Sequence, residues 1–382
     1  MSGKKRSSSL VSTPTQLYLS FELGEKDWTL GFTIGLGQEP RKRKIVARDL
    51  KALEQEIARA KQRFGLPDTA PVHSCYEAGR DGFWLHRYLT AHHIENRVVD
   101  SSSIEVNRRA KHAKTDRIDA GKLVMMLVRY DLGEHKLWSV VHVPSVEAED
   151  ARHLHRELLA LKRDHTRHVN RIKGLLSGQG VSLIVGANFL HALDAVRLWD
   201  SAPLPAGVRA RLEREYTCGQ SIHQHILQLE AERAELIRTS QDASVDKVRR
   251  LLRLCGIGDN SAWLYVMEFF GWREFHNRRE VGGLAGLAAT PFDSGDQSRD
   301  QGISKAGNSP IRAMAIEIAW CWLRYQPDSE LSRWFNKRFG QGGKRLRKIG
   351  FVALARKLLI ALWRYLEDGV IPAGAQLKPT SA

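Results

Sequence analysis

Four acidic residues in the first third of the chain have the chemical type and placement of metal ligands. They are Glu22, Glu77, Asp116 and Asp119. Carboxylate oxygens are the ligands that Mg²⁺ prefers. Two ions held between such groups activate the attacking oxygen and neutralise the leaving oxygen in phosphodiester chemistry. The four acids together predict a site for Mg²⁺ or Mn²⁺ that acts on nucleic acid.

The elements predicted around these acids bring them to one edge of a sheet. Three β-rich runs start at Leu17, and a helix over 49–64, a strand (VHSCYE), a helix, a strand (NRVVD) and a helix over about 115–130 follow. In this βββαβαβ order the first and fourth strands are neighbours, so Glu22 and Glu77 lie at the same edge. The last helix presents Asp116 and Asp119 on one face. We therefore expect an α/β domain over residues 16–143.

Each acid also has a simpler interpretation. An Asp-x-x-Asp pair at a helix start is typical of N-terminal capping. Glu22 shares its strand face with Tyr18 and Ser20, and this face could be solvated rather than part of a site. If Glu22 is not a ligand, the nearby residues Glu25 and Asp27 are the alternatives.

The remainder of the chain predicts mainly helices. Two highly charged stretches within residues 144–240 carry apolar residues at three- and four-residue steps, which favours a coiled coil or two helices of an ordinary bundle. Residues 241–370 predict a mainly α-helical domain in which a Gly-Ile-Gly turn resembles a helix-hairpin-helix, a motif that binds DNA phosphate, but it could equally be a tight interhelical turn. Residues 1–15 and 371–382 are expected to be tails, the first of them basic and disordered.

Charge and composition indicate a nucleic-acid partner. The 382 residues include 59 Lys and Arg against 43 Asp and Glu, a net charge of +16, which attracts polyanions. No apolar run approaches the roughly 20 residues that span a bilayer, so we expect no membrane association. The four cysteines show no paired spacing, which fits a reducing cytoplasm and suggests neither a disulfide framework nor a zinc knuckle.

Three motifs resemble the bridge-RNA-guided transposases of bacterial insertion sequences, the one-ten family and its eleven-eleven branch. They are YEAGRDGFWL, KTDRIDAGKL and ATPFDSGDQ with the ISKAGNSPIRAMAI that follows it. The resemblance implies an RNase H-like (RuvC-type) domain with a DEDD acid set, a coiled coil, and a C-terminal transposase domain. It covers nearly the whole chain. Glu22 stands where the family usually has Asp, which changes the reach of that carboxylate by one methylene.

The same resemblance implies the chemistry and the partners. Ser294 would be the nucleophile that forms a phosphoserine intermediate with DNA, together with the carboxylate site in the assembled complex. A noncoding bridge RNA would choose donor and target DNA by base pairing, and a homodimer would assemble into a tetramer. Without the resemblance, the Ser-Gly dipeptide at 294–295 predicts only a turn.

Eight basic residues and one asparagine in three segments are the candidate nucleic-acid contacts. They are Lys114, Arg117, Lys305, Asn308, Arg312, Lys344, Arg345, Arg347 and Lys348. Arg grips phosphate with two parallel hydrogen bonds, and Lys acts as a point charge. Asn308 could instead cap a helix that has Pro310 in its first turn. Four tryptophans at helical spacing are expected in the core rather than stacked on bases: Trp320, Trp322, Trp334 and Trp363.

Two other functions fit the same residues. The first is a metal-dependent endonuclease of the Holliday-junction type, which uses the carboxylates and water with no covalent intermediate and in which Ser294 is structural. The second is a non-catalytic nucleic-acid scaffold, in which the acids only cap helices or lie on the surface. Metal dependence separates the scaffold from both enzymes, and a covalent protein–DNA adduct separates the recombinase from the nuclease.

Overall fold

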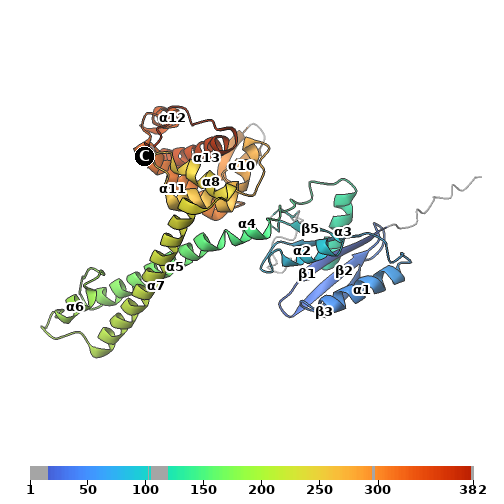
Figure 1. Ribbon diagram of the computed structural model, residues 1–382, viewed down its shortest axis with the longest axis horizontal. Helices are drawn as coiled ribbons and strands as arrows, with labels where there is room; N and C mark the ends of the chain where they lie inside the picture. The colour runs from blue at the N-terminus through green and yellow to red at the C-terminus, as the bar shows by residue number, and fades with distance from the viewer. Residues whose placement is uncertain (1–15, 102, 105–118, 295–296, 380–382) are drawn as a thin grey trace, which may run out of the picture. The chain divides into compact units, whose positions relative to one another are not determined.

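The computed structural model describes residues 16–101, 103–104, 119–294 and 297–379, with the backbone alone at 291–294 and 297–301. The chain divides into two compact units, Met1–Val143 and Pro144–Ala382. Figure 1 shows a sheet with its helices in the first unit, and only helices and one hairpin as regular elements in the second. No described helix is both long and apolar enough to cross a bilayer.

The first unit is built on a five-stranded mixed sheet. Its strands are β1 (Leu17–Leu23), β2 (Asp27–Thr33), β3 (Arg41–Val46), β4 (Val72–Glu77) and β5 (Glu95–Val99). Their spatial order is β3-β2-β1-β4-β5. The first three strands form an antiparallel meander, and β4 runs parallel to both β1 and β5. The predicted element order and the adjacency of the first and fourth strands are both confirmed.

Helices cover both faces of this sheet, and the alternation along β1 decides which residues face which helix. On one face Leu19 and Phe21 pack with residues of α1 (Leu50–Arg63) and α2 (Trp84–Ala91). On the other face Tyr18 packs with α3 (Ala120–Asp131). Ser20 is fully buried there, and its hydroxyl donates a hydrogen bond to the carbonyl of Ala120. The face that Glu22 shares with these residues is therefore covered, not solvated.

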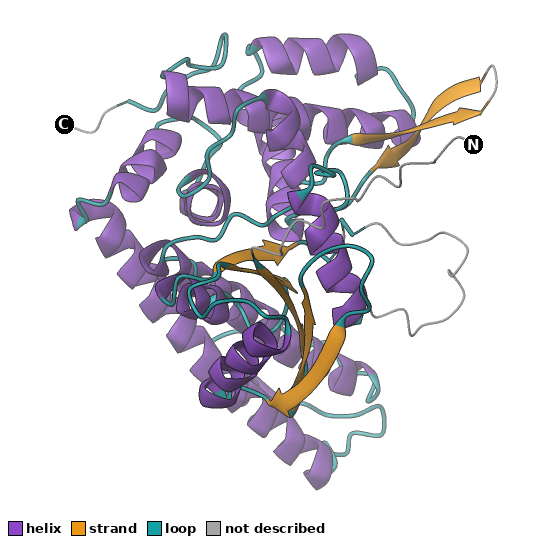
Figure 2. Cartoon of the chain, turned by 90° about the vertical axis from the view of Figure 1, so that its right-hand side faces the viewer, coloured by secondary structure: helices purple, strands orange, loops and turns teal. Residues whose placement is uncertain are grey.

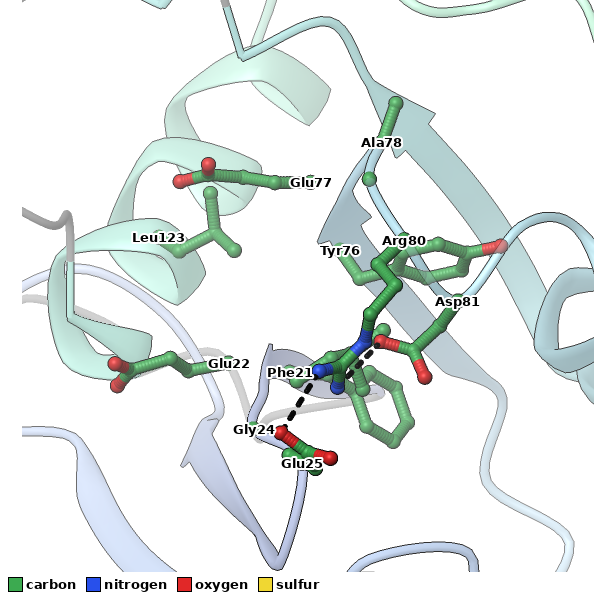
Figure 3. A pocket seen from close by; sticks show the side chains of 12 residues that line it. Phe21, Glu22, Gly24, Glu25, Tyr76, Glu77, Ala78, Arg80, Asp81 and Leu123 are labelled. Atoms are coloured by element: carbon green, nitrogen blue, oxygen red, sulfur yellow. Dashed lines mark ion pairs between the residues drawn. The ribbon is translucent and has the colours of Figure 1, made fainter. Parts of the chain in front are cut away.

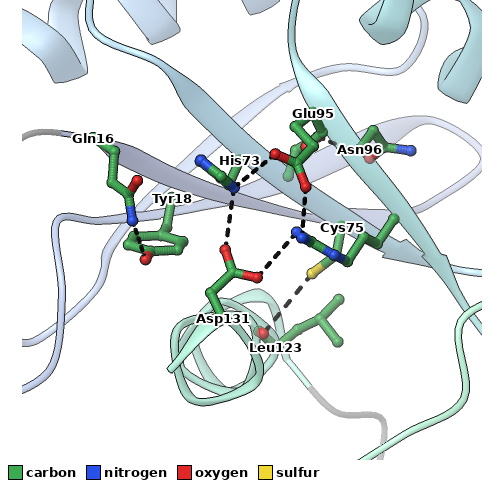
Figure 4. Close-up of polar contacts among 10 residues, drawn as sticks. Gln16, Tyr18, His73, Cys75, Glu95, Asn96, Leu123 and Asp131 are labelled. Atoms are coloured by element: carbon green, nitrogen blue, oxygen red, sulfur yellow. Dashed lines mark hydrogen bonds and ion pairs between the residues drawn. The ribbon is translucent and has the colours of Figure 1, made fainter. Parts of the chain in front are cut away.

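A polar cluster joins the far end of α3 to the sheet (Figure 4). The Asp131 carboxylate lies 3.1 Å from His73 Nδ1 on β4 and 3.1 Å from a terminal nitrogen of Arg97 on β5. The Arg97 guanidinium also lies 5.5 Å from the ring centre of Tyr130. Burial raises the pKa of the Cys75 thiol beside this cluster, which makes Cys75 a packing residue rather than a nucleophile. These contacts fix where α3 crosses the sheet.

The second unit begins with a helical arm. After the short α4 (Val146–Asp150), two long helices, α5 (His153–Ser177) and α7 (Ala206–Thr239), pack against each other, as the sequence predicts. Figure 1 shows α6 (Phe189–Asp194) at the far end of the arm. A small apolar core there contains Leu176, Phe189 and Leu212.

The rest of the second unit is a helical domain, and most of its other helices pack around the last one. Its elements are α8 (Ala243–Leu252), α9 (Asp259–Tyr265), the π-helical turn η2 (Val266–Phe270), α10 (Arg278–Leu284), β6 (Ala289–Ser294), β7 (Gln297–Ile303), α11 (Ser309–Tyr325), α12 (Glu330–Phe339) and α13 (Lys344–Asp368). The antiparallel hairpin β6–β7 was not predicted, and it extends away from the helices (Figure 2). Trp322 is buried as expected. Trp320 is not buried, since 55% of its surface is exposed. Its ring stacks on the ring of Phe351.

The Gly-Ile-Gly turn between α8 and α9 is closed by other parts of the chain. Gly256 has φ +88°, a backbone conformation that favours glycine. The Cys255 N–H donates to the Gln376 carbonyl, and the Lys378 ammonium donates to the Ile257 carbonyl. Residues 376–378, expected in a tail, thus pack on this turn. These contacts favour the interpretation as an interhelical turn over that of a phosphate site.

Candidate active site and nucleic-acid interface

Glu22 and Glu77 line one pocket at the carboxyl ends of β1 and β4. The parallel register pairs Phe21 with Tyr76, so the two glutamates follow directly on neighbouring strands. Both are half-buried, and the pocket between them has a volume of about 590 Å³. Leu123 of α3 also lines it, and Figure 3 shows the two glutamate side chains extending to the side on which α3 lies. The structure thus brings together two of the four predicted acids.

Asp119 has a different environment. It is the N-cap of α3, where its Oδ1 accepts a hydrogen bond from the Lys122 N–H over 2.9 Å and its Oδ2 lies 3.0 Å from Lys42 Nζ. The hydrogen bond from Lys122 and the ammonium of Lys42 hold the pKa of Asp119 below its ordinary range. It lines a second pocket of about 460 Å³ beside Lys42. The helix therefore starts at Ala120 rather than near 115, because Asp119 has extended backbone angles.

Asp116, Lys114 and Arg117 lie outside the described residues. Within the described ranges no group of three or more His, Cys, Asp or Glu side chains is placed to hold a metal ion. The pocket at β1 and β4 thus offers two carboxylates of the type that Mg²⁺ takes, which is part of a coordination sphere. Two carboxylates alone do not complete such a coordination sphere.

The two alternative acids are engaged with cations. Glu25 lines the same pocket as Glu22, and its carboxylate lies 3.4 Å from the Arg80 guanidinium (Figure 3). Asp27 lies 2.7 Å from Lys44 Nζ on β3. Arg80 was missed by the sequence analysis, although it lies within the motif YEAGRDGFWL. Its guanidinium places a positive charge at the edge of the acidic pocket.

Ser294 is the last residue of β6. In the hairpin register it pairs with Gln297, the first residue of β7. The turn that the sequence predicts at 293–296 thus becomes the connection of a β-hairpin. This places the backbone of Ser294 at the end of the hairpin, away from the helical core.

A large cationic cleft lies in the helical domain, next to the base of this hairpin. Its volume is about 1500 Å³, and its lining includes Ala289 of β6 and Ile303 of β7. Eight cationic residues line it: Arg278, Arg279, Lys305, Arg312, Arg345, Lys348, Arg356 and Lys357. None of the described residues that line it is acidic. An accumulation of unopposed positive charge in a concave surface is the electrostatic property expected of a polyanion site.

Half of these cations were predicted from the sequence. Lys305, Arg312, Arg345 and Lys348 were predicted as nucleic-acid contacts and do line the cleft. Arg278, Arg279, Arg356 and Lys357 were missed because they lie outside the basic runs. Helical spacing was the available signal, since Arg345, Lys348, Val352, Arg356 and Ile360 lie three or four residues apart on one face of α13.

Other predicted contacts have structural partners. Asn308 is the N-cap of α11, with its Oδ1 accepting from the Ile311 N–H over 3.0 Å, and Pro310 lies in the first turn. The Arg312 guanidinium donates to the Lys305 carbonyl over 2.9 Å. Lys344 and Arg347 are exposed on the first turns of α13 but do not line the cleft. Asn308 and Arg312 therefore shape the backbone beside the cleft.

The comparisons with known proteins identify the family. Residues 248–332 match the family model for the transposase IS116/IS110/IS902 family. The chain is 40% identical, over 95% of its length and 94% of the relative's, to a Sinorhizobium fredii protein named as a transposase. It is 27% identical to the transposase for insertion sequence element IS1328 of Yersinia enterocolitica, over 57% of this chain and 63% of that one. It is also 25% identical to the transposase for element IS1111A of Coxiella burnetii, over 67% of each chain. The chain therefore belongs to the IS116/IS110/IS902 family of transposases.

Proposed function

We propose that this transposase cuts and rejoins DNA through a phosphoserine intermediate on Ser294, with a bridge RNA as guide. The observation that carries the proposal is the pairing of Glu22 and Glu77 in one pocket at the ends of neighbouring parallel strands. An acid pair at this place in a βββαβαβ sheet is the arrangement of an RNase H-like, RuvC-type domain. The family supports the reaction class, since its members are transposases.

In this proposal Glu22 and Glu77 hold the metal ion with Asp116 and Asp119. When bound there, Mg²⁺ or Mn²⁺ supplies positive charge that stabilises an ionised attacking oxygen and the departing oxygen. For Asp119 to contribute, its carboxylate must exchange the hydrogen bond from Lys122 and the ion pair with Lys42. Arg80 balances the charge of the acidic pocket when it is empty of metal.

Ser294 carries the covalent step. As its Oγ forms a bond to phosphorus, the bond from phosphorus to a deoxyribose oxygen breaks, and the serine proton is transferred to the departing sugar oxygen. The sugar hydroxyl of another strand then attacks the same phosphorus and releases the serine. The phosphodiester is conserved at each step, so no external energy source is needed.

The positive charge of the cleft and the helical arm indicate which partners the protein binds. The cationic cleft holds DNA or RNA phosphate, and the reaction takes place on the nucleoid in the cytoplasm. Two protomers are needed to exchange two duplexes, and the far end of the arm provides a surface for a second copy and for tetramer assembly. Near the far end of the arm Ile184 and Trp199 are 88% and 94% exposed. In the proposed dimer these two side chains are buried against the second copy.

The test is a search for a covalent protein–DNA adduct on denaturing gels. The full chain, its co-expressed RNA, Mg²⁺ and supercoiled element DNA are combined. We expect an adduct that is lost in Ser294→Ala and in Glu77→Gln but retained in Ser298→Ala, a control on the opposite strand of the hairpin. Metal-dependent nicking with no adduct would instead support the water-using endonuclease. No cleavage at all in the presence of RNA and metal would support the scaffold.

A further inference from the structure

One face of α13 carries cations interspersed with apolar residues. The cations Arg345, Lys348, Arg356, Lys357 and Arg364 line the large cleft or the smaller one that continues from it. The two clefts share Arg278, Lys357 and Ile360, so they form one groove. At 1.5 Å per residue the stretch from Arg345 to Arg364 spans about 28 Å. The groove is therefore long enough for several nucleotides.

The floor of this groove is apolar. Ile349, Val352 and Ile360 lie between the cations on α13 and line the groove, and Ile316 of α11 lines it with them. Ile349 is 53% exposed, which leaves much of an isoleucine side chain in water. Such a floor inside a cationic rim requires a ligand that has both anionic and apolar surfaces.

A tryptophan forms part of the wall. Trp334 of α12 lines the groove, and the Lys357 ammonium lies 4.7 Å from its ring centre. Trp334 also meets Phe339 edge to face, with ring centres 5.5 Å apart. These contacts hold the indole in place beside a positive charge. Aromatic and cationic groups held side by side are the pair of features with which proteins bind unstacked bases and their phosphates.

We infer that this groove binds an unpaired nucleotide strand, with phosphates on the cations of the rim and bases on the apolar floor. In a duplex the flat faces of the bases are stacked inside and only their edges are reached from the grooves, so those faces cannot cover Ile349 and Val352. Unpaired bases expose flat apolar faces that cover such a floor irrespective of sequence. The inference rests on the proposed function in one respect only: both require that the groove binds nucleic acid. The strand can be DNA or RNA, since both have this chemistry.

The experiment compares two adjacent residues of α13 that differ in chemistry. Full-length protein is titrated into fluorescently labelled oligonucleotides of about ten nucleotides, a length within known single-strand site sizes. The probes are single-stranded DNA, single-stranded RNA of the same sequence, and the DNA duplex. The variants are Ile349→Gln, which removes apolar floor, and Lys348→Gln, which removes rim charge. Leu227→Gln is the control, because Leu227 is 46% exposed on α7, outside the groove.

We expect Ile349→Gln to weaken binding of a single strand about five- to tenfold, from the loss of part of the apolar burial of one isoleucine side chain, and to change duplex binding less than twofold. Lys348→Gln should reduce the slope of log K against log salt for the single strand by about 0.7. Whichever single strand binds more tightly identifies the source, DNA or RNA. Leu227→Gln should bind all three probes as the parent chain does.

Equal effects of Ile349→Gln on single strand and duplex, or no effect on either, would overturn the inference. If Lys348→Gln also leaves every affinity and salt slope unchanged, the groove is not a nucleic-acid site, and that part of the proposed function fails with it. An adduct that survives in Ser294→Ala would refute the serine chemistry but would leave the binding result intact. All four proteins should unfold at the same temperature, because both α13 residues and Leu227 are exposed.

Discussion

The Glu268 carboxylate lies 2.6 Å from Arg156 Nε and 2.9 Å from His155 Nε2, where the arm joins the helical domain. Glu268 is part of the π-helical turn η2 and is almost fully buried. Both of its partners lie in the first turn of α5. π-Helical turns interrupt the regular helix repeat and turn a side chain to a new direction. The turn thus points the Glu268 carboxylate from the core of the domain towards the base of the arm.

This ion pair predicts a pH dependence of stability. Burial alone would raise the pKa of Glu268, but the hydrogen bonds from His155 and Arg156 outweigh it and lower the pKa from 4.5 to about 2. Because the folded pKa is below the unfolded one, the stabilisation is complete above about pH 4.5 and is lost as the pH falls towards 2. It amounts to about 3 kcal/mol.

The measurement is urea unfolding of the parent chain and of Glu268→Gln from pH 7 to pH 3. We expect the variant to be less stable by about 3 kcal/mol at pH 7, since it removes the ionised carboxylate that both Arg156 and His155 contact. The difference should shrink as the pH falls below 4.5. A difference that stays constant over this range would show that ionised Glu268 does not stabilise the fold.

The sequence was sufficient to predict the first unit, because its strands alternate and its helices have apolar stripes of helical period. The start of α3 was predicted wrongly because Asp119 is the N-cap of this helix rather than a residue inside it. The spacing of the apolar residues does not reveal which acid is the cap. The hairpin β6–β7 was missed because SGDQSRDQ is polar and reads as a loop. Glu268 has no signal in the sequence, since it lies within the apolar run YVMEFFGW and its partners are over 100 residues away.

Two substitutions at Asp119 separate capping from metal binding. Asn caps a helix as well as Asp does, so Asp119→Asn should preserve the stability of the first unit, whereas Asp119→Ala should lower it by about 1 kcal/mol. If Asp119 is also a metal ligand, both variants should lose the DNA adduct. The measurements are thermal unfolding and the adduct assay.

Asp49 provides the matched control, because it caps α1 with the same kind of hydrogen bond, its Oδ1 accepting from the Ala52 N–H over 3.0 Å. Asp49→Ala should cost similar stability and leave the adduct unchanged. Full adduct formation in Asp119→Asn would assign Asp119 to capping alone. The exposed pair with Lys42 should change these results little, because surface ion pairs contribute less than about 1 kcal/mol.

Glu22 and Glu25 line one pocket but should differ in metal binding. Glu22→Gln should weaken Mn²⁺ binding at least tenfold, as loss of even an outer partner of a metal site does. Glu25→Gln should weaken it far less, since the Glu25 carboxylate is paired with Arg80. Glu22→Asp should retain binding, because it restores the acid expected from the family resemblance. Titration of free Mn²⁺ by electron paramagnetic resonance measures the affinity without requiring catalysis, and equal losses in the Glu22 and Glu25 variants would contradict the assignment.

The exposed tip of the arm is the surface at which we expect two copies of the chain to associate. Trp199 is 94% exposed in a loop between α6 and α7, and burial of an indole against a second copy would stabilise an interface more than most single side chains do. Trp199→Ser should therefore shift the protein towards monomer in sedimentation velocity at micromolar concentration. Leu132→Ser is the control, since Leu132 is 66% exposed in the first unit and is not part of the arm. An unchanged sedimentation coefficient in Trp199→Ser, with a folded far-ultraviolet spectrum, would place the interface elsewhere in the chain.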